Sequence, residues 1–442
     1  VNYKVTVENK GGATGTYSLT DTPQFDDDVT INSGAYSGQA SGAMNTVGST
    51  TLADGSSLAA GGTHMYNVSF IVTLNLDANS PDGGDNIYTA CEVPGNGPGS
   101  TPEHGLYNKA DLDRNDDGSV EVTDDACGDL PYIVMKKDFV GVVANANGTY
   151  TVNYNIVVEN KGGATGTYSL SDTPQFDDDV TINSGSYSGQ ASGSMNTTGS
   201  TTLASGSSLA ANGSHTYNVS FVVTLDLGAN STDGGDNIYT ACGVVGNGPG
   251  ASPEQGLYNK AELDRNADGT VEVTDDACGD LPYIVMKKDF VGVVANANGT
   301  YTVNYNIVVE NKGGASGTYN LKDTPQFDDD VVINSGSYSG QASGSMNTSG
   351  STTLADGSSL SAGGTHTYNV SFVVTLNLEA NSTDGGDNIY TECEVSGNGP
   401  GSSPEQGLYN KAELDRNDDG SVEVTDDACG DLPYIVMKKD FV

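Results

Sequence analysis

From Tyr150 to Val158 every second residue is apolar, and most of the residues between them are polar. Successive side chains of a β-strand point to opposite faces, so this alternation predicts a strand with one buried face. A longer alternation runs from Tyr217 to Leu227 and predicts a second strand of the same kind. We therefore expect sheets that bury one face and expose the other to water.

Shorter β-rich segments surround these two strands and are separated by Gly, Pro, Asn and Asp. They are Thr167–Leu170, Val180–Ile182, Ser186–Tyr187 and Asn237–Cys242. One further run, Leu257–Leu263, is compatible with a short helix. About seven short strands with turns between them predict a Greek-key β-sandwich, so we expect an all-β protein.

The whole pattern occurs three times. Nearly identical segments begin at Val1, Val152 and Val303, with an offset of 151 residues and no insertion between copies. Solenoid repeats are about 20–50 residues long, whereas a period of this length suits a complete domain with its own core. We therefore expect three sandwich modules in tandem.

The chain is strongly acidic, because 58 Asp and Glu residues against 17 Lys and Arg give a formal net charge of −41. Binding to phosphate groups depends on clusters of Lys and Arg, so neither nucleic acid nor an anionic membrane surface is an expected partner. No segment approaches the roughly 20 apolar residues of a membrane-spanning helix, and we expect no membrane span. Repulsion of this size keeps modules apart and favours bound cations.

Six cysteines occur as two per repeat, 36 residues apart each time. In a chain of secreted character, an even and regular set predicts one disulfide per module and an extracellular or cell-surface location. Buried free thiols are the alternative, and a zinc site is less favoured because no further His or Cys lies nearby in the sequence. The expected pairs are Cys91 with Cys127, Cys242 with Cys278, and Cys393 with Cys429.

A twelve-residue acidic loop in each repeat fits the calcium pattern D-x-[DN]-x-D-G. Side chains 1, 3 and 5, the carbonyl of 7, position 9 and a carboxylate at 12 supply the oxygens, and Gly at 6 permits the turn. Asp at position 12 resembles the loops of dockerins, and a single loop per module indicates a structural Ca²⁺ site. A solvated acidic turn is the alternative. The expected ligands are Asp113, Asn115, Asp117, Ser119, Glu121 and Asp124, then Asp264, Asn266, Asp268, Thr270, Glu272 and Asp275, then Asp415, Asn417, Asp419, Ser421, Glu423 and Asp426.

Two other acidic groups recur at each period and are weaker candidates for further calcium. They are the run Asp26–Asp28 and the pair Asp82 and Asp85. Catalysis is not expected, because the four histidines form no Ser–His or Cys–His pattern and no glycine-rich phosphate loop precedes a helix.

Two further hypotheses concern binding and cross-linking. Calcium-containing sandwiches can hold glycans, and Tyr36, Tyr187 and Tyr338 offer rings for stacking although Trp is absent. An intramolecular amide bond between a lysine, Lys161 or Lys288, and a nearby asparagine is also possible.

The segments Asn147–Gly162 and Tyr168–Ile182, with a Thr-Val-Asn-rich strand before an Asp-Thr-Pro turn, resemble the conserved repeat domain found in tandem on bacterial and archaeal surface proteins. The resemblance covers about a third of each module. It implies an immunoglobulin-like sandwich and a role in a stalk or surface layer, and it carries over no catalytic residues. The cysteine pair and the acidic loop are departures from the family's basic pattern.

In the resembling family, the segment before the Asn-Gly hairpin is the first strand of a module. The sequence PYIVMKKDFV, which occurs at 131–140, 282–291 and 433–442, then opens each following module. The expected modules are 1–130, which lacks an opening strand, 131–281 and 282–432. Residues 433–442 are then the opening strand of a following repeat or a strand donated to another copy.

These expectations combine into an extracellular structural protein that forms a calcium-stabilised fibre, filament or adhesin stalk. Its expected partners are neighbouring copies or repeats of itself, arranged head to tail. The fibre is either one long covalent repeat or separate subunits joined by donated strands. A calcium-dependent glycan-binding or adhesive module is the alternative, although no distinct binding head is visible among three uniform repeats.

Overall fold

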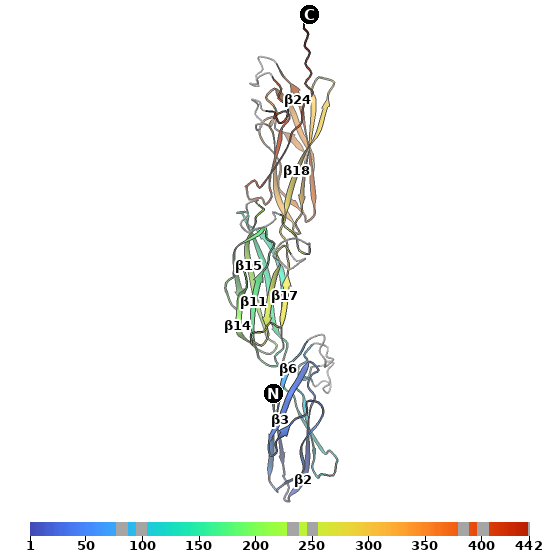
Figure 1. Ribbon diagram of the computed structural model, residues 1–442, viewed down its shortest axis with the longest axis vertical. Helices are drawn as coiled ribbons and strands as arrows, with labels where there is room; N and C mark the ends of the chain where they lie inside the picture. The colour runs from blue at the N-terminus through green and yellow to red at the C-terminus, as the bar shows by residue number, and fades with distance from the viewer. Residues whose placement is uncertain are drawn as a thin grey trace.

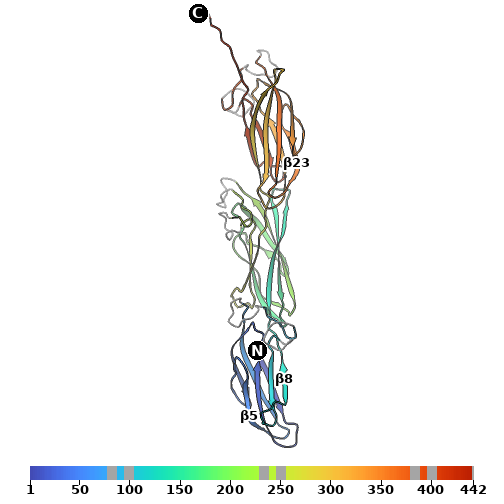
Figure 2. The ribbon, with the colours of Figure 1, turned by 90° about the vertical axis from the view of Figure 1, so that its right-hand side faces the viewer.

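The structure is a computed structural model of the chain. It describes residues 1–76, 87–93, 104–227, 238–244, 255–378, 389–395 and 406–440. Three β-sandwiches follow one another along a rod, and both views show them end to end (Figure 1, Figure 2). Every regular element within these ranges is a β-strand, and each module contains two antiparallel sheets. The predicted all-β sandwich fold is therefore confirmed.

The second module shows the complete arrangement. Its first sheet has the order β13-β12-β15-β10-β9, and its second sheet has the order β14-β11-β16-β17. The strands are β9 (Ile133–Ala144), β10 (Tyr150–Asn160), β11 (Gly166–Pro174), β12 (Val180–Gly189), β13 (Gly193–Ser194), β14 (Thr201–Leu209), β15 (Ser214–Leu225), β16 (Asn259–Asp264) and β17 (Val273–Ala277).

The third module repeats this topology, with sheets β18-β19-β24-β21-β22 and β23-β20-β25-β26. Its strands are β18 (Ile284–Ala295), β19 (Tyr301–Asn311), β20 (Gly317–Pro325), β21 (Val331–Gly340), β22 (Gly344–Met346), β23 (Thr352–Leu360), β24 (Thr365–Leu376), β25 (Asn410–Asp415) and β26 (Val424–Ala428).

The first module differs in one strand. Its sheets are β1-β6-β3-β4 and β5-β2-β7-β8, so β1 forms an edge of its sheet where the other modules have a further strand. Its strands are β1 (Asn2–Glu8), β2 (Gly15–Pro23), β3 (Val29–Gly38), β4 (Gly42–Ala43), β5 (Thr50–Leu58), β6 (Thr63–Leu74), β7 (Asn108–Asp113) and β8 (Val122–Ala126).

The core lies between the two sheets and comes from the alternating positions of each strand. In the second module, Tyr154 and Ile156 of β10 are 1% and 0% exposed, and Tyr217 of β15 is 0% exposed. The buried Tyr168 hydroxyl lies 2.6 Å from that of Tyr217 and 2.7 Å from Nδ1 of His215, which satisfies its polar end. The alternation seen in the sequence therefore marks the buried face correctly.

Two local expectations are wrong, and a third is right in the type of element but not in its bounds. Leu257–Leu263 is not helical, because β16 pairs with β11 and buries every second residue in the core. Val180–Ile182 and Ser186–Tyr187 belong to one strand with a bulge. Of Asn237–Cys242, residue 237 lies outside the described residues and 238–242 are not a strand.

The predicted disulfides are confirmed in all three modules. Each one joins the segment after the long central strand to the residue that follows the last strand of the second sheet. Closing a loop of this length stabilises a domain by about 3–4 kcal/mol in the chain-entropy model.

Candidate functional site

The first module has an open groove along the outer edge of β1. The groove has a volume of about 500 Å³ and runs between β1 and the strands β7 and β8 of the other sheet. Apolar side chains line it together with the carboxyl group of Asp21 and the amide of Asn108. Tyr3 and Val5 are only half-buried there, and so are Ala110 and Leu112, which face them.

In the second module this groove is filled by β9. The strand pairs with β10 along its whole length and places Ile133 and Met135 in the core, where they are 1% and 9% exposed. The backbone N–H of Lys137 donates to the carboxylate of Asp275 on β17 at 2.6 Å, which ties β9 to the opposite sheet. β18 fills the third module in the same way, and its Lys288 N–H donates to Asp426 at the same distance.

A buried polar cluster lies under β9. The Nζ of Lys137 donates to Oδ1 of Asp172 on β11, and Nδ2 of Asn259 on β16 donates to Oδ2 of the same carboxyl at 2.9 Å. The three residues are 3%, 0% and 0% exposed. Burial lowers the pKa of Lys137 and raises the pKa of Asp172, because both charged forms are removed from water.

The third module contains the same cluster. Lys288 donates to Asp323, and Asn410 donates to the other carboxyl oxygen at 2.9 Å. In both modules, the ammonium group also lies 5.0 Å from a tyrosine ring centroid.

The first module holds this cluster without its lysine. Asp21 is 1% exposed, and its Oδ1 has no hydrogen-bond partner. Burial raises the pKa of Asp21 to about 6, against which a hydrogen bond from Asn108 acts. Asp124, which corresponds to Asp275, is exposed and lines the groove. The floor of the groove therefore carries two carboxyl groups whose counterparts elsewhere bind the opening strand.

The sequence that fills the groove in the other modules also occurs in an exposed segment. Residues 433–440 extend away from the third module and belong to no strand (Figure 1, Figure 2). Ile435 and Met437 are each 92% exposed, whereas their counterparts Ile133 and Met135 are buried. Lys439 of this segment corresponds to Lys137 and Lys288.

The acidic loops adopt a compact turn around their first aspartate. In the first module, Oδ1 of Asp113 accepts the N–H of Asn115 and Asp117, each at 3.2 Å, and Oδ2 accepts the N–H of Gly118 at 2.8 Å. Gly118 has a φ of 91°, which explains the glycine at position 6. Carboxylate oxygens of Asp113, Asp117 and Glu121 lie within 4.8 Å of one another.

The second module gathers Asp264, Asp268 and Glu272 in the same way. The third repeats the hydrogen bonds from Asp419 and Gly420 to Asp415. Clustered oxygen donors of this kind fit a hard cation such as Ca²⁺. The turn places position 12 elsewhere, since Asp275 and Asp426 lie on the following strand and accept hydrogen bonds from the opening strand.

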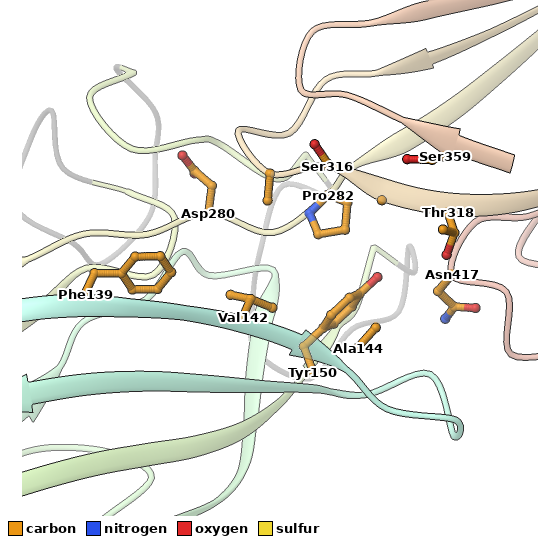
Figure 3. Close-up of a pocket in the computed structure, with 12 residues that line it drawn as sticks. Phe139, Val142, Ala144, Tyr150, Asp280, Pro282, Ser316, Thr318, Ser359 and Asn417 are labelled. Carbon is orange, nitrogen blue, oxygen red and sulfur yellow. The ribbon is translucent and has the colours of Figure 1, made fainter. Parts of the chain in front are cut away.

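Each loop of the second and third modules faces the preceding module. The tip of the hairpin between β9 and β10 touches the loop of the third module, where a Cβ at Gly148 (φ 77°) would lie 2.2 Å from Oδ2 of Asp419. Within the third module, the guanidinium of Arg416 lies 5.9 Å from the ring centroid of Tyr283. Figure 3 shows a pocket of about 400 Å³ at this joint, with Phe139 and Tyr150 on one side and Asn417 on the other.

The other candidates are arranged differently. The carboxylates of Asp26, Asp27 and Asp28 lie within 4.8 Å of one another, as do those of the corresponding residues in the other modules. Asp82 and Asp85 lie outside the described residues. Tyr187 is half-buried and pairs within its sheet with Gly193, and Lys161 is an exposed residue beside Glu159.

Lys288 was a cross-link candidate from the sequence, but its buried neighbours Asp323 and Asn410 were missed. The alternation of buried and exposed positions could have indicated them, because each of these three polar residues stands at a position of its strand that faces the core. Polar residues on an apolar face are rare unless they pair with one another, so their coincidence indicates a shared contact.

No family model matches the chain, and no curated protein matches it. Among solved structures, a variant of the major pilin subunit of Bacillus cereus aligns over 73% of this chain and 77% of its own, with 9% identity and a TM-score of 0.22. Red sea bream transglutaminase aligns over 67% of this chain with 9% identity and a TM-score of 0.17, and the aligned part is 30% of that enzyme. An exo-chitosanase of Amycolatopsis orientalis aligns over 68% of this chain and 27% of its own, also with a TM-score of 0.17. With scores this low, these likenesses decide nothing about function.

Among the described residues, we find no helix of the length and apolar character needed to cross a membrane.

Proposed function

We propose that this chain is an extracellular structural protein that assembles head to tail into a fibre. The sequence PYIVMKKDFV completes the first module as well, either as a segment ahead of β1 in a longer covalent repeat or as residues 433–442 of another copy inserted beside β1. The three disulfides and the strongly acidic composition support a location outside the cell. We assign the chain a structural role and no catalytic one.

One observation carries this proposal. The same ten-residue sequence occurs three times, fills a sandwich twice as β9 and β18, and is exposed over residues 433–440 the third time, while the residues lining the groove of the first module correspond to those that β9 and β18 contact. Asp21 and Asp124 stand where Asp172 and Asp275 bind Lys137. Lys439 is the residue of the exposed segment that would meet them.

The directions of the strands agree with a head-to-tail fibre. β9 enters its module at the joint with the first module, where the ring of Tyr132 lies 6.3 Å from that of Tyr88 in the first module. It runs toward the third module, since its hairpin tip at Gly148 touches the loop at Asp419. A strand donated to the first module would therefore enter at the end of that module that faces away from the second, opposite the end of the rod from which residues 433–440 project (Figure 1).

Calcium ions at the acidic loops complete the proposal. Asp264, Asn266, Asp268, the carbonyl of Thr270 and Glu272 would hold one ion in the second module, and the equivalent residues would hold one in each other module. The loops of the second and third modules lie at joints, so an ion there would neutralise carboxylates that face the neighbouring module. The loop of the first module would meet the hairpin at Asn296–Gly299 of the preceding copy.

Light scattering coupled to size-exclusion chromatography tests strand donation. The full chain should form concentration-dependent oligomers, and a chain that ends at residue 432 should stay monomeric. Ile435→Ala should weaken assembly because its side chain would enter the core, whereas Lys438→Ala should not, since the corresponding Lys136 is exposed.

A second variant checks that the groove is the acceptor. Placing a copy of residues 131–151 ahead of Val1 would supply the first module with its own opening strand, and this variant should not assemble. Monomers of the unmodified full chain at high concentration would refute strand donation between copies.

A further inference from the structure

Three chemically complementary groups meet between the two sheets of the second module. The amine of Lys137 comes from the first sheet, and the carboxyl of Asp172 and the carboxamide of Asn259 come from the second. All three side chains are essentially inaccessible to solvent. The carboxyl touches both the amine nitrogen and the amide nitrogen, so it lies between a nucleophile and a group that can leave as ammonia.

This cluster is poorly explained as a simple ion pair. An isolated lysine and aspartate gain little net stability from pairing in a core, because removing both charges from water offsets their attraction. A third polar side chain, that of Asn259, is buried beside them, and its Oδ1 has no hydrogen-bond partner. Burial lowers the pKa of the Lys137 amine and raises the pKa of the Asp172 carboxyl, which favours the uncharged form of each group.

We propose that Lys137 and Asn259 form a covalent amide bond, and that Lys288 and Asn410 do the same in the third module. The neutral amine Nζ attacks Cγ of the asparagine, a new C–N bond forms, and the original C–N bond of the carboxamide breaks. Asp172 takes a proton from the attacking amine and delivers one to the departing nitrogen, which leaves as ammonia. The carboxyl group ends in its initial state, and no oxidant, metal or cofactor is required.

Such a bond would join the two sheets of the sandwich near the end of the module where the chain enters. β9 opens the module, and β16 belongs to the sheet whose last strand leads to the next module. A pulling force along the rod would then pass through the cross-link and bypass most of the folded domain. The disulfide, which joins Cys242 to Cys278, constrains a different part of the chain.

The first module contains the acid and the amide of this set, Asp21 and Asn108, and in residues 433–442 the lysine that corresponds to Lys137 is Lys439. This part of the inference rests on the proposed strand donation. If residues 433–442 of a second copy enter the groove, Lys439 would reach Asp21 and Asn108 as Lys137 reaches Asp172 and Asn259. The same reaction would then join one copy to the next by a covalent amide bond.

Intact mass spectrometry of the reduced, denatured chain tests the bonds within modules. The mass should fall below that of the sequence by two ammonia molecules, and digestion should yield a branched peptide that contains Lys137 and Asn259. Asp172→Ala should reduce the mass deficit from two ammonia molecules to one, since the bond in the third module remains as an internal control. Lys136→Ala should leave the deficit unchanged. A mass equal to that of the sequence overturns the proposal, and a loss of water in place of ammonia would place the bond on Asp172 and overturn the assignment of Asn259.

A denaturing gel of assembled material tests the bond between copies. A ladder that survives boiling and reduction supports it, and Lys439→Arg should abolish the ladder while oligomers persist in native chromatography. Oligomers of the unmodified chain that dissociate completely to monomers on the gel overturn the bond between copies but leave strand donation intact. If no oligomers form at all, the proposed strand donation is refuted. The mass of the denatured chain then still tests the bonds within the second and third modules.

Discussion

The first and second modules have nearly the same sequence but differ in how completely their cores are closed. Tyr154 is 1% exposed and Ala261 and Leu263 are each 0% exposed, whereas their counterparts Tyr3, Ala110 and Leu112 are only half-buried. The difference follows from a single strand, since β9 covers the second module and, among the described residues, β1 is the edge strand of its sheet. A module of this protein is therefore complete only with a strand that arrives from the direction of the preceding unit.

The joints show the same contrast. The hairpin between β9 and β10 reaches the loop of the third module, and the pocket lined by both has a volume of about 390 Å³. At the joint between the first and second modules, the corresponding pocket is lined by residues 72–76 and the loop of the second module and is about 640 Å³. The opening strand thus contributes both to the core of its own module and to the contact with the next.

The largest expected effect separates the two equivalent aspartates. Asp172→Asn should destabilise the second module by about 3–5 kcal/mol, because it removes the carboxyl group that the buried Lys137 and Asn259 both contact and, on the proposal above, prevents their cross-link. Asp21→Asn should instead stabilise the first module at neutral pH, since it removes a buried carboxylate with no lysine beside it. Calorimetry of the separate unfolding transitions measures both changes.

The same pair gives a pH test. Burial raises the pKa of Asp21 from its ordinary 3.8 to about 6, so the folded module holds this proton more tightly than the unfolded chain does. The contribution of Asp21 to stability is therefore present below pH 3.8 and is lost as the pH rises toward 6. Asp21→Asn should remove this loss of stability from the unfolding transition of the first module. A loss of stability over the same pH range in the variant would contradict the assignment to Asp21.

A smaller effect is expected at two equivalent isoleucines. Ile133→Ala should cost the second module about 2–5 kcal/mol, because Ile133 is 1% exposed and its loss leaves a cavity. Ile435→Ala should leave the unfolding of an unassembled chain unchanged, because that side chain is 92% exposed. Equal losses for both variants, measured by chemical denaturation at low concentration, would show that residues 433–440 are already packed in the free chain.

The smallest effect concerns the acidic loops. Asp268→Asn should lower calcium affinity at a joint and increase bending between the first two modules, which small-angle scattering would register as a shorter maximum dimension. Asp117→Asn, in the loop at the free end of the rod, should lower calcium binding without changing the dimension of the single chain. A chelator should shorten the maximum dimension as Asp268→Asn does. Equal bending with and without calcium would show that the acidic loops do not stiffen the joints.

Several features could be predicted from local sequence. The alternation from Tyr150 to Val158 marks the buried face of β10, because strand geometry makes that pattern a direct consequence of one-sided burial. Cysteine spacing predicted the disulfides for a similar reason, since each module contains only one possible internal pair. By contrast, Leu257–Leu263 was ambiguous, because a run of seven residues fits either period until β11 pairs with it.

The acidic loop was predictable only in part. Positions 1 to 9 lie within one tight turn, so their spacing in sequence determines their spacing in space. Position 12 falls on the next strand, where Asp275 binds the N–H of Lys137 from a segment more than a hundred residues earlier. No local pattern contains that contact.

The sequence by itself therefore determined the fold class, the period, the disulfides and the composition of the acidic loops, because each depends on neighbours along the chain. Only the tertiary structure decided that Lys137, Asp172 and Asn259 meet, that Asp21 has an unpartnered oxygen, and that the groove beside β1 matches residues 433–440. These features arise where two sheets face each other across the core, and the packing of distant strands, not the order of residues within one, sets which side chains touch.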